Sequence, residues 1–131
     1  MAYLLDADWA IRALARDFHI ISTLDRLAPE GIALTWITLG EIYEGAFGHP
    51  DPQAQLDRFR RFLSGFPVLD LDASIMERFA QLRAMLRRRG QLVPDFDLLL
   101  AATAICYDLV VLTSNVRHLE RIPGIRIYRQ E

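Results

Sequence analysis

The stretch Tyr3-Leu4-Leu5-Asp6, near the start of the chain, sets the expected fold. Three apolar residues that end at a charge are typical of a strand buried on both faces of a parallel sheet. Apolar residues at helical spacing, such as Trp9 and Leu14, predict a helix directly after this strand. A strand followed by a helix that packs on the same sheet is the repeating unit of an α/β protein.

The same alternation continues along the chain. Further strands are expected over residues 32–36, 66–71, 109–112 and 125–128. Further helices are expected over residues 22–27, 38–47, 52–63, 73–89 and 94–104, and a turn at 113–115 should lead into a short helix that ends at about residue 121. This order predicts a single α/β/α sandwich over residues 1–131, with a mostly parallel central sheet.

The composition excludes several classes of protein. With 52% hydrophobic and 24% charged residues, the 131-residue chain has the composition of a globular domain. All 15 of its Lys and Arg residues are Arg, which excludes mechanisms that need a lysine amine. The formal net charge of −2 argues against binding nucleic acid by overall charge, so any such contact must be local.

Cysteine usage and apolar runs bear on location. The one cysteine, Cys106, lies in an apolar run, where we expect it to be buried and inert. No basic leader precedes Asp6, and the longest apolar run, residues 98–107, is far shorter than the ~20 residues of a membrane span. We therefore expect a cytoplasmic protein with no membrane partner.

Polar residues follow the expected strands at the edge where parallel α/β proteins bind ligands. Asp6 ends the first strand, Glu41 and Asp97 lie in early helical turns, and Ser114 and Asn115 follow the strand at 109–112. Two carboxylates about 4 Å apart repel by about 4 kcal/mol at an effective dielectric constant near 20. A cluster of them therefore needs protonation or a cation, and oxygen ligands favour Mg²⁺ or Mn²⁺.

Each acid except Asp6 also has a purely structural interpretation. Glu41 completes a capping-box spacing with Thr38, which would start a helix there. Asp97 would interact favourably with a helix N-terminus, and Asp8 has the position of an N-cap for the first helix. Asp6, at a strand end, has no expected capping role. The functional and structural interpretations both remain open at this point.

Four blocks of sequence resemble the PIN domain of VapC-type toxins. They run over residues 3–6, 37–46, 97–104 and 112–124, and together they cover nearly the whole chain in order. The resemblance implies a metal-dependent endoribonuclease, usually a homodimer, that is held inactive by a small antitoxin encoded beside it. It also implies that Asp6, Glu41 and Asp97 are the leading metal-site carboxylates.

The mechanism that we expect follows from this set of residues. One or two divalent ions on the three carboxylates would activate a water and polarise the scissile phosphodiester of an RNA substrate. Asn115 is a candidate further metal ligand through its carbonyl oxygen. The candidate substrate-binding residues are Arg117, Arg12, Ser114 and His118.

The chain departs from the family pattern at two places. Ala7 and Asp8 stand where relatives usually have a hydroxyl residue and Asn, and Ser114 and Asn115 stand in a block where many carry a fourth acid. One alternative is therefore a catalytically impaired PIN-like domain that binds an antitoxin or RNA. A second is a haloacid-dehalogenase-like phosphatase, because an Asp-x-Asp pair follows an apolar strand, although such enzymes usually need a lysine.

Overall fold

The computed structural model describes residues 1–129. Its strands are β1 (Tyr3–Leu5), β2 (Ile32–Thr35), β3 (Val68–Leu69) and β4 (Val110–Leu112). Its α-helices are α1 (Ala7–Leu14), α2 (Phe18–Leu27), α3 (Trp36–Phe47), α4 (Pro52–Leu63), α5 (Ala73–Arg88), α6 (Asp95–Tyr107) and α7 (Val116–Leu119), and η1 (Ala28–Glu30) is a 3-10 turn.

All pairs in the sheet are parallel, in the order β3-β2-β1-β4. Tyr3 of β1 is paired with Ile32 of β2 on one side and with Val110 of β4 on the other. The carboxyl ends of these three strands therefore meet at one edge. This confirms the expected α/β class and parallel sheet, and it positions the candidate site.

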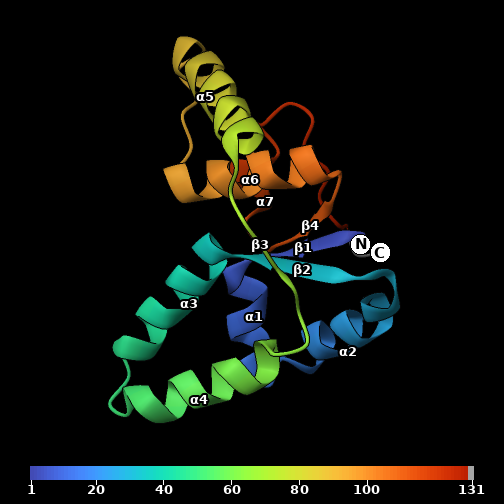
Figure 1. Ribbon diagram of the computed structural model, residues 1–131, viewed down its shortest axis with the longest axis vertical. Coiled ribbons are helices and arrows are strands. Elements are labelled where there is room, and N and C mark those ends of the chain that lie inside the picture. The colour runs from blue at the N-terminus through green and yellow to red at the C-terminus, as the bar shows by residue number, and fades with distance from the viewer. Residues whose placement is uncertain (130–131) are drawn as a thin grey trace.

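Helices cover both faces of the sheet (Figure 1). Helices α1 to α4 lie on one face, whereas α5, α6 and α7 lie on the other. Leu5 and Leu34 belong to the first core and Leu4 and Ala33 to the second, because successive side chains of a strand point to opposite faces. All four are fully buried, which explains why these strands are apolar at consecutive positions.

Three helices begin earlier than the sequence predicts, because different residues cap them. The N-cap of α1 is Asp6 rather than Asp8, and its side chain accepts a hydrogen bond from Ala7 N. Asp17 caps α2 by accepting from Ile20 N, so that helix starts at Phe18. Thr35 caps α3, so the expected capping box between Thr38 and Glu41 is wrong.

Two predicted strands and one predicted burial also differ. The strand expected over 66–71 is reduced to β3, which follows Pro67, a residue without a backbone donor. The strand expected over 125–128 forms only an isolated parallel bridge, between Val111 and Ile127. Cys106 is exposed, because it lies in the last turn of α6 beyond the part of that helix that packs on the sheet. Within residues 1–129, no helix has the length and apolar character of a membrane span.

Gly31 fixes how the first two strands meet. Its φ is +91°, and its carbonyl oxygen accepts hydrogen bonds from Ala2 N and Tyr3 N. A Cβ at this position would lie 2.9 Å from Met1 Cα. Only glycine combines this backbone conformation with such a close approach.

We therefore predict that Gly31→Ala lowers the free energy of unfolding by about 1–3 kcal/mol. Gly45→Ala is the matched control, because a Cβ there would meet nothing within 4 Å inside α3. That substitution should stabilise the protein by about 0.5–1 kcal/mol, since alanine favours helix. Urea unfolding of both variants measures the difference, and a Gly31→Ala variant as stable as the parent would contradict the strain.

Candidate active site

Acidic side chains gather at the carboxyl end of the sheet. Asp6 directly follows β1, Asp8 lies in the first turn of α1, and Asp97 lies in the first turn of α6. Glu41 lies further along α3. The charges of Asp8 and Asp97 both raise the pKa of Asp6, so these groups interact although they come from separate parts of the chain.

Two buried threonines place Glu41 near the end of β1. The Thr35 hydroxyl accepts from Thr38 N at 3.1 Å, which caps α3. The Thr38 hydroxyl donates to the carbonyl oxygen of Leu5 at 3.4 Å. The first turn of α3 is thereby attached to the last residue of β1, and Glu41 follows one turn later. Glu41 therefore has no capping role, and its structural interpretation is removed.

Asp6 is buried, with only 7% of the residue exposed, and two hydrogen bonds hold its carboxylate in place. Its Oδ1 accepts from Ala7 N at 2.8 Å, and its Oδ2 accepts from the Thr113 hydroxyl at 2.7 Å. Burial raises the pKa of Asp6 to about 6, with a further increase from the charge of Asp8 and a decrease from the Thr113 bond. Asp6 thus does cap a helix, but it does so from inside an acidic cluster.

Glu41 has an even higher proton affinity. Burial raises the pKa of Glu41 to about 7, and the charges of Asp6, Asp97 and Asp8 add to this effect. Within residues 1–129, neither Glu41 nor Asp6 forms an ion pair with a basic side chain. The protein therefore concentrates negative charge here without neutralising it.

The loop after β4 contacts three carboxylates with three consecutive residues. Thr113 donates from its hydroxyl to Asp6, Ser114 donates from its backbone N to Asp8 Oδ2 at 2.9 Å, and Asn115 donates from Nδ2 to Asp97 Oδ2 at 3.0 Å. The hydroxyl of Thr113 also accepts from Asn115 N at 2.9 Å, which fixes the loop itself.

Thr113 is a site residue that the sequence analysis missed. Its hydroxyl donates to Asp6, whereas Ala7 stands at the position where relatives usually carry a hydroxyl residue. The sequence shows only that a hydroxyl residue directly follows an apolar run, whereas its burial and the pairing of β4 with β1 are seen in the structure alone. Asp8 was expected to be the N-cap of the first helix, but it lies inside α1. Its side chain accepts hydrogen bonds from Trp9 N and from Ser114 N.

The other predicted residues divide into two groups. Asn115 and His118 both face Asp97, with His118 Nδ1 3.6 Å from Asp97 Oδ2 and without a hydrogen-bond partner. Arg12 joins the loop, because its Nη1 donates to the Ser114 hydroxyl at 2.7 Å. Arg117 is exposed on α7 and has no hydrogen bond or ion pair within the described chain.

The donor chemistry of this cluster fits a hard divalent cation. Asp6, Glu41 and Asp97 offer carboxylate oxygens, and the raised pKa values of Asp6 and Glu41 reflect burial and crowded negative charge that a cation would balance. Over residues 1–129, however, no three His, Cys, Asp or Glu side chains lie close enough to hold a metal ion as they stand. Binding would therefore require side-chain movements that draw the carboxylates together.

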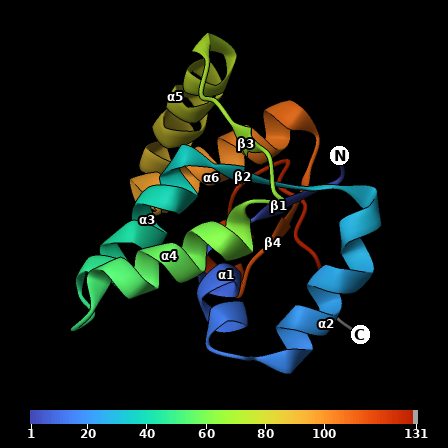
Figure 2. The same ribbon diagram turned by 60° about the horizontal axis from the view of Figure 1, so that its bottom comes forward.

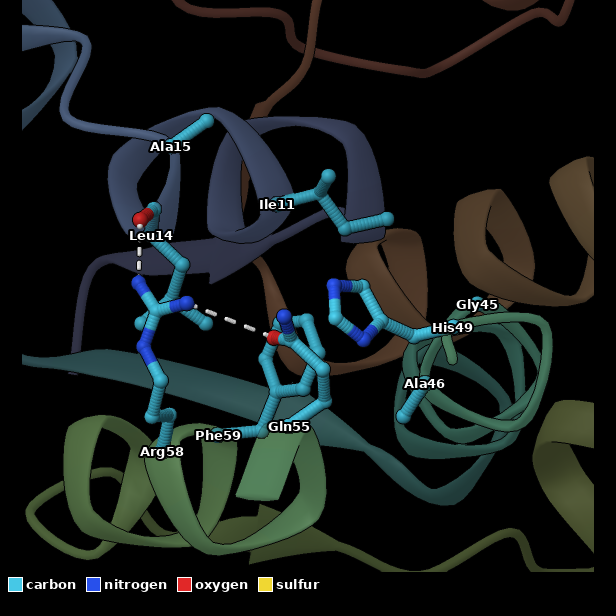
Figure 3. A pocket seen from close by; sticks show the side chains of 9 residues that line it. All are labelled: Ile11, Leu14, Ala15, Gly45, Ala46, His49, Gln55, Arg58 and Phe59. Carbon is cyan, nitrogen blue, oxygen red and sulfur yellow. Dashed lines mark hydrogen bonds between the residues drawn. The ribbon is translucent and has the colours of Figure 1, made fainter. Parts of the chain in front are cut away.

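A separate apolar pocket lies between α1, α3 and α4 and does not share these carboxylates (Figure 3). Arg58 donates there to the carbonyl oxygen of Leu14 at 2.8 Å and to Gln55 Oε1 at 3.4 Å. His49 points into the pocket, and its Nδ1 accepts from Asp51 N. Figure 2 shows the same three helices grouped on one face of the molecule. This pocket has no cluster of acids and is not the candidate active site.

A four-stranded parallel sheet with acids converging at its carboxyl end is the arrangement expected of a PIN-type nuclease domain. The family model for the PIN domain matches residues 3–125, so the chain belongs to this family.

Within the family, the chain is similar to VapC proteins. It is 34% identical to the tRNA(fMet)-specific endonuclease VapC of Salmonella typhimurium, over 97% of this chain and 96% of that protein. It is 28% identical to Ribonuclease VapC2 of Haemophilus influenzae, over 96% of each. These matches leave the phosphatase alternative without support.

Solved structures agree with the sequence comparison. The fold matches a chain in the DNA-bound VapBC structure from Salmonella typhimurium with a TM-score of 0.91 and 33% identity, over 98% of this chain and 97% of that chain. A chain of VapBC2 from Rickettsia felis, bound to a DNA fragment from its promoter, matches over the full length of both chains with a TM-score of 0.93 and 25% identity.

The raised proton affinity of Glu41 has a measurable effect on stability. The pKa of Glu41 is about 7 in the folded protein, compared with 4.5 for an ordinary glutamate. The metal-free fold therefore loses stability as the pH rises from 4.5 to about 7, because the unfolded chain gives up this proton more readily than the folded protein. In the presence of a chelator, Glu41→Gln should therefore gain stability relative to the parent as the pH rises from about 5 to 8. Glu77→Gln, which removes an exposed carboxylate from α5, is the matched control.

Urea unfolding across this pH range measures the effect. If the stability difference between Glu41→Gln and the parent does not change with pH, the carboxylate of Glu41 is not destabilised by its surroundings and the proposed clustering of charge is wrong.

Proposed function

We propose that this chain is a divalent-metal-dependent endoribonuclease that acts as the toxin of a type II toxin-antitoxin pair. The observation that carries the proposal is the group of Asp6, Glu41 and Asp97 at the carboxyl end of a PIN-domain sheet, with no basic side chain paired to Asp6 or Glu41 in the described chain. The ribonuclease names of its VapC relatives support the same activity.

The proposed metal ligands are the three carboxylates, with the side-chain oxygen of Asn115 as a further ligand. Oxygen-only ligands favour Mg²⁺ or Mn²⁺ over softer metals. When bound, such an ion would lower the pKa of a coordinated water and balance charge on the scissile phosphate.

The chain's own residues hold the carboxylates and contact the substrate. Thr113 orients Asp6 through its hydroxyl, and Asn115 orients Asp97 through its amide. An acidic site repels RNA, so basic residues at its border must attract the phosphate backbone. We propose Arg12 and Arg117 for this role, with Ser114 and His118 as further polar contacts.

The proposed partner is a small antitoxin, because the fold matches chains from VapBC complexes. The homodimer remains a prediction, as does the single domain over residues 1–131. We place the activity in the cytoplasm, where the proposed RNA substrate occurs.

The nuclease function predicts that the purified protein cuts RNA when Mn²⁺ or Mg²⁺ is present and not when a chelator is added. Glu41→Gln and Asp97→Asn should each lower the cleavage rate at least 100-fold, because each removes a proposed ligand. Glu44→Gln is the matched control and should cleave at the parent's rate. Gel analysis of labelled RNA measures all four proteins.

Two outcomes would contradict the nuclease. If RNA remains intact at high protein concentration while RNA binding persists, the chain is a binding module, as the loss of the fourth acid allows. If Glu41→Gln and Asp97→Asn cleave as fast as the parent, the observed cleavage comes from a contaminant.

The toxin function predicts that the small protein encoded beside this gene binds the chain and inhibits it. Co-expression of the two should yield a stable complex on size-exclusion chromatography, with RNA cleavage suppressed relative to the isolated toxin. A neighbouring protein that binds without reducing cleavage, or that does not bind, would contradict the assignment as an antitoxin-controlled toxin.

A further inference from the structure

A second pocket, of about 250 Å³, adjoins the acidic cluster on the side of α1 and α2. It lies between these helices, the loop after β4 and the end of the described chain. Its lining residues are Trp9, Arg12, His19, Ile20, Thr113, Ser114, Val116, Tyr128 and Arg129. Thr113 and Ser114 therefore border both the pocket and the carboxylates that they contact.

The charged side chains that line this pocket are basic, although Arg12 is paired with Asp17 and Arg129 with Glu120. Its lining contains Arg12, Arg129 and His19 but no aspartate or glutamate. Thr113 and Ser114, on the shared border, contact the carboxylates Asp6 and Asp8. A polyanion laid across this border would meet carboxylates at one point and guanidinium groups at the next.

Arg12 is held in place at the border. Its Nε and Nη2 donate to Asp17 Oδ2 at 3.1 and 2.8 Å, and its Nη1 donates to the Ser114 hydroxyl. The guanidinium group of an arginine presents five donors in a planar arrangement that suits phosphate oxygens. Because several contacts already fix Arg12, little conformational freedom is lost when it binds a phosphate.

Arg129 is the more loosely held of the two arginines. Its side chain is 61% exposed, and its ion pair with Glu120 has a long Nη2 to Oε2 distance of 3.7 Å. Exposed pairs of this kind contribute little to stability. Arg129 can therefore exchange Glu120 for a phosphate at small cost.

Tyr128 gives the pocket an aromatic wall. Its ring meets Trp9 edge to face with a centroid distance of 6.0 Å, and its hydroxyl accepts from Arg26 Nη2 at 2.9 Å. The residue is half-buried, so part of the ring remains open to the pocket. An aromatic ring held from two sides is a suitable surface for stacking an unpaired RNA base.

We propose that this pocket is a nucleotide-binding subsite for single-stranded RNA. It takes the base of the nucleotide next to the scissile phosphate against Tyr128, and Arg12 and Arg129 bind the flanking phosphate. The volume lies below the ~300–1,000 Å³ of sites for drug-sized ligands, which suits one base. This inference rests on the proposed ribonuclease function, because it assigns part of the substrate to the pocket.

The first test compares Arg129→Gln with Arg88→Gln, which removes the same charge from the exposed end of α5. Binding of a short fluorescent single-stranded RNA is measured by anisotropy in the presence of a chelator, so that no RNA is cut. Arg129→Gln should bind about tenfold more weakly at low salt. The slope of log K against log salt should fall by about 0.7, as expected for one lost phosphate contact on a single strand. Arg88→Gln should bind like the parent.

The second test concerns the base. Tyr128→Leu should weaken binding by about tenfold, whereas Tyr128→Phe, which keeps the ring and loses only the hydroxyl, should bind within about twofold of the parent. Removing the base from one nucleotide of the RNA should weaken its binding to the parent protein. The same removal should not weaken binding to Tyr128→Leu any further. Thermal unfolding of each variant shows whether it is folded. If Tyr128→Leu does not fold, the comparison of Arg129→Gln with Arg88→Gln still tests the subsite.

The outcomes separate the two proposals. Cleavage by the parent in Mn²⁺ together with equal RNA binding by Arg129→Gln and Arg88→Gln overturns the subsite and leaves the nuclease intact. RNA binding that depends on Arg129, without any cleavage by the parent, supports the pocket as a binding site for single-stranded RNA but overturns the nuclease, and with it the position of the pocket beside a scissile phosphate. If Arg129→Gln instead binds RNA normally but no longer forms the antitoxin complex, the pocket belongs to the protein partner and the inference is wrong.

Discussion

The pairing of β1 with β4 is the constraint on which the acidic site depends. Leu5 lies opposite Leu112, and the backbone N of Asp6 donates to the carbonyl oxygen of Leu112 at 3.0 Å. Asp6 and Thr113 are therefore the first residues beyond two adjacent strands that end together. Their side chains meet because the register is fixed by fully buried leucines, and a slip of one residue would move every side chain of β1 to the other face of the sheet.

Next to these strand ends, the loop after β4 stabilises the cluster of carboxylates by hydrogen bonding. Thr113, Ser114 and Asn115 each donate a hydrogen bond to a different acid. Hydrogen bonds to a carboxylate favour its charged form, whereas burial and neighbouring charges favour the protonated form. At Asp6 burial is the larger influence, since its pKa rises to about 6 despite two donors. The loop thus orders the acids without neutralising them, which leaves a divalent cation as the natural counter-charge.

The sequence predicted the elements of this arrangement better than the contacts between them. Continuous apolar runs identified β1, β2 and β4, because a strand buried on both faces has no polar alternation to obscure it. Helix starts were less predictable, because Asp6, Asp17 and Thr35 cap their helices in competition with other polar residues nearby. The role of Thr113 depends on which strand pairs with β1, and a contact across 107 positions leaves no local pattern in the chain.

The residues that depart from the family pattern, Asp8 and Asn115, lie close to the same loop after β4. The chain has Asn115 in a block where many relatives carry a fourth acid, and Asp8 in the second position after its first aspartate. The charge of Asp8 is the largest electrostatic contribution from a neighbour that raises the pKa of Asp6, and Asp8 is attached to the same loop through Ser114 N. The site therefore has four acidic side chains, with Asp8 on α1 and Asn115 in the loop after β4. Asn115 then donates to Asp97, where a fourth carboxylate would have repelled it.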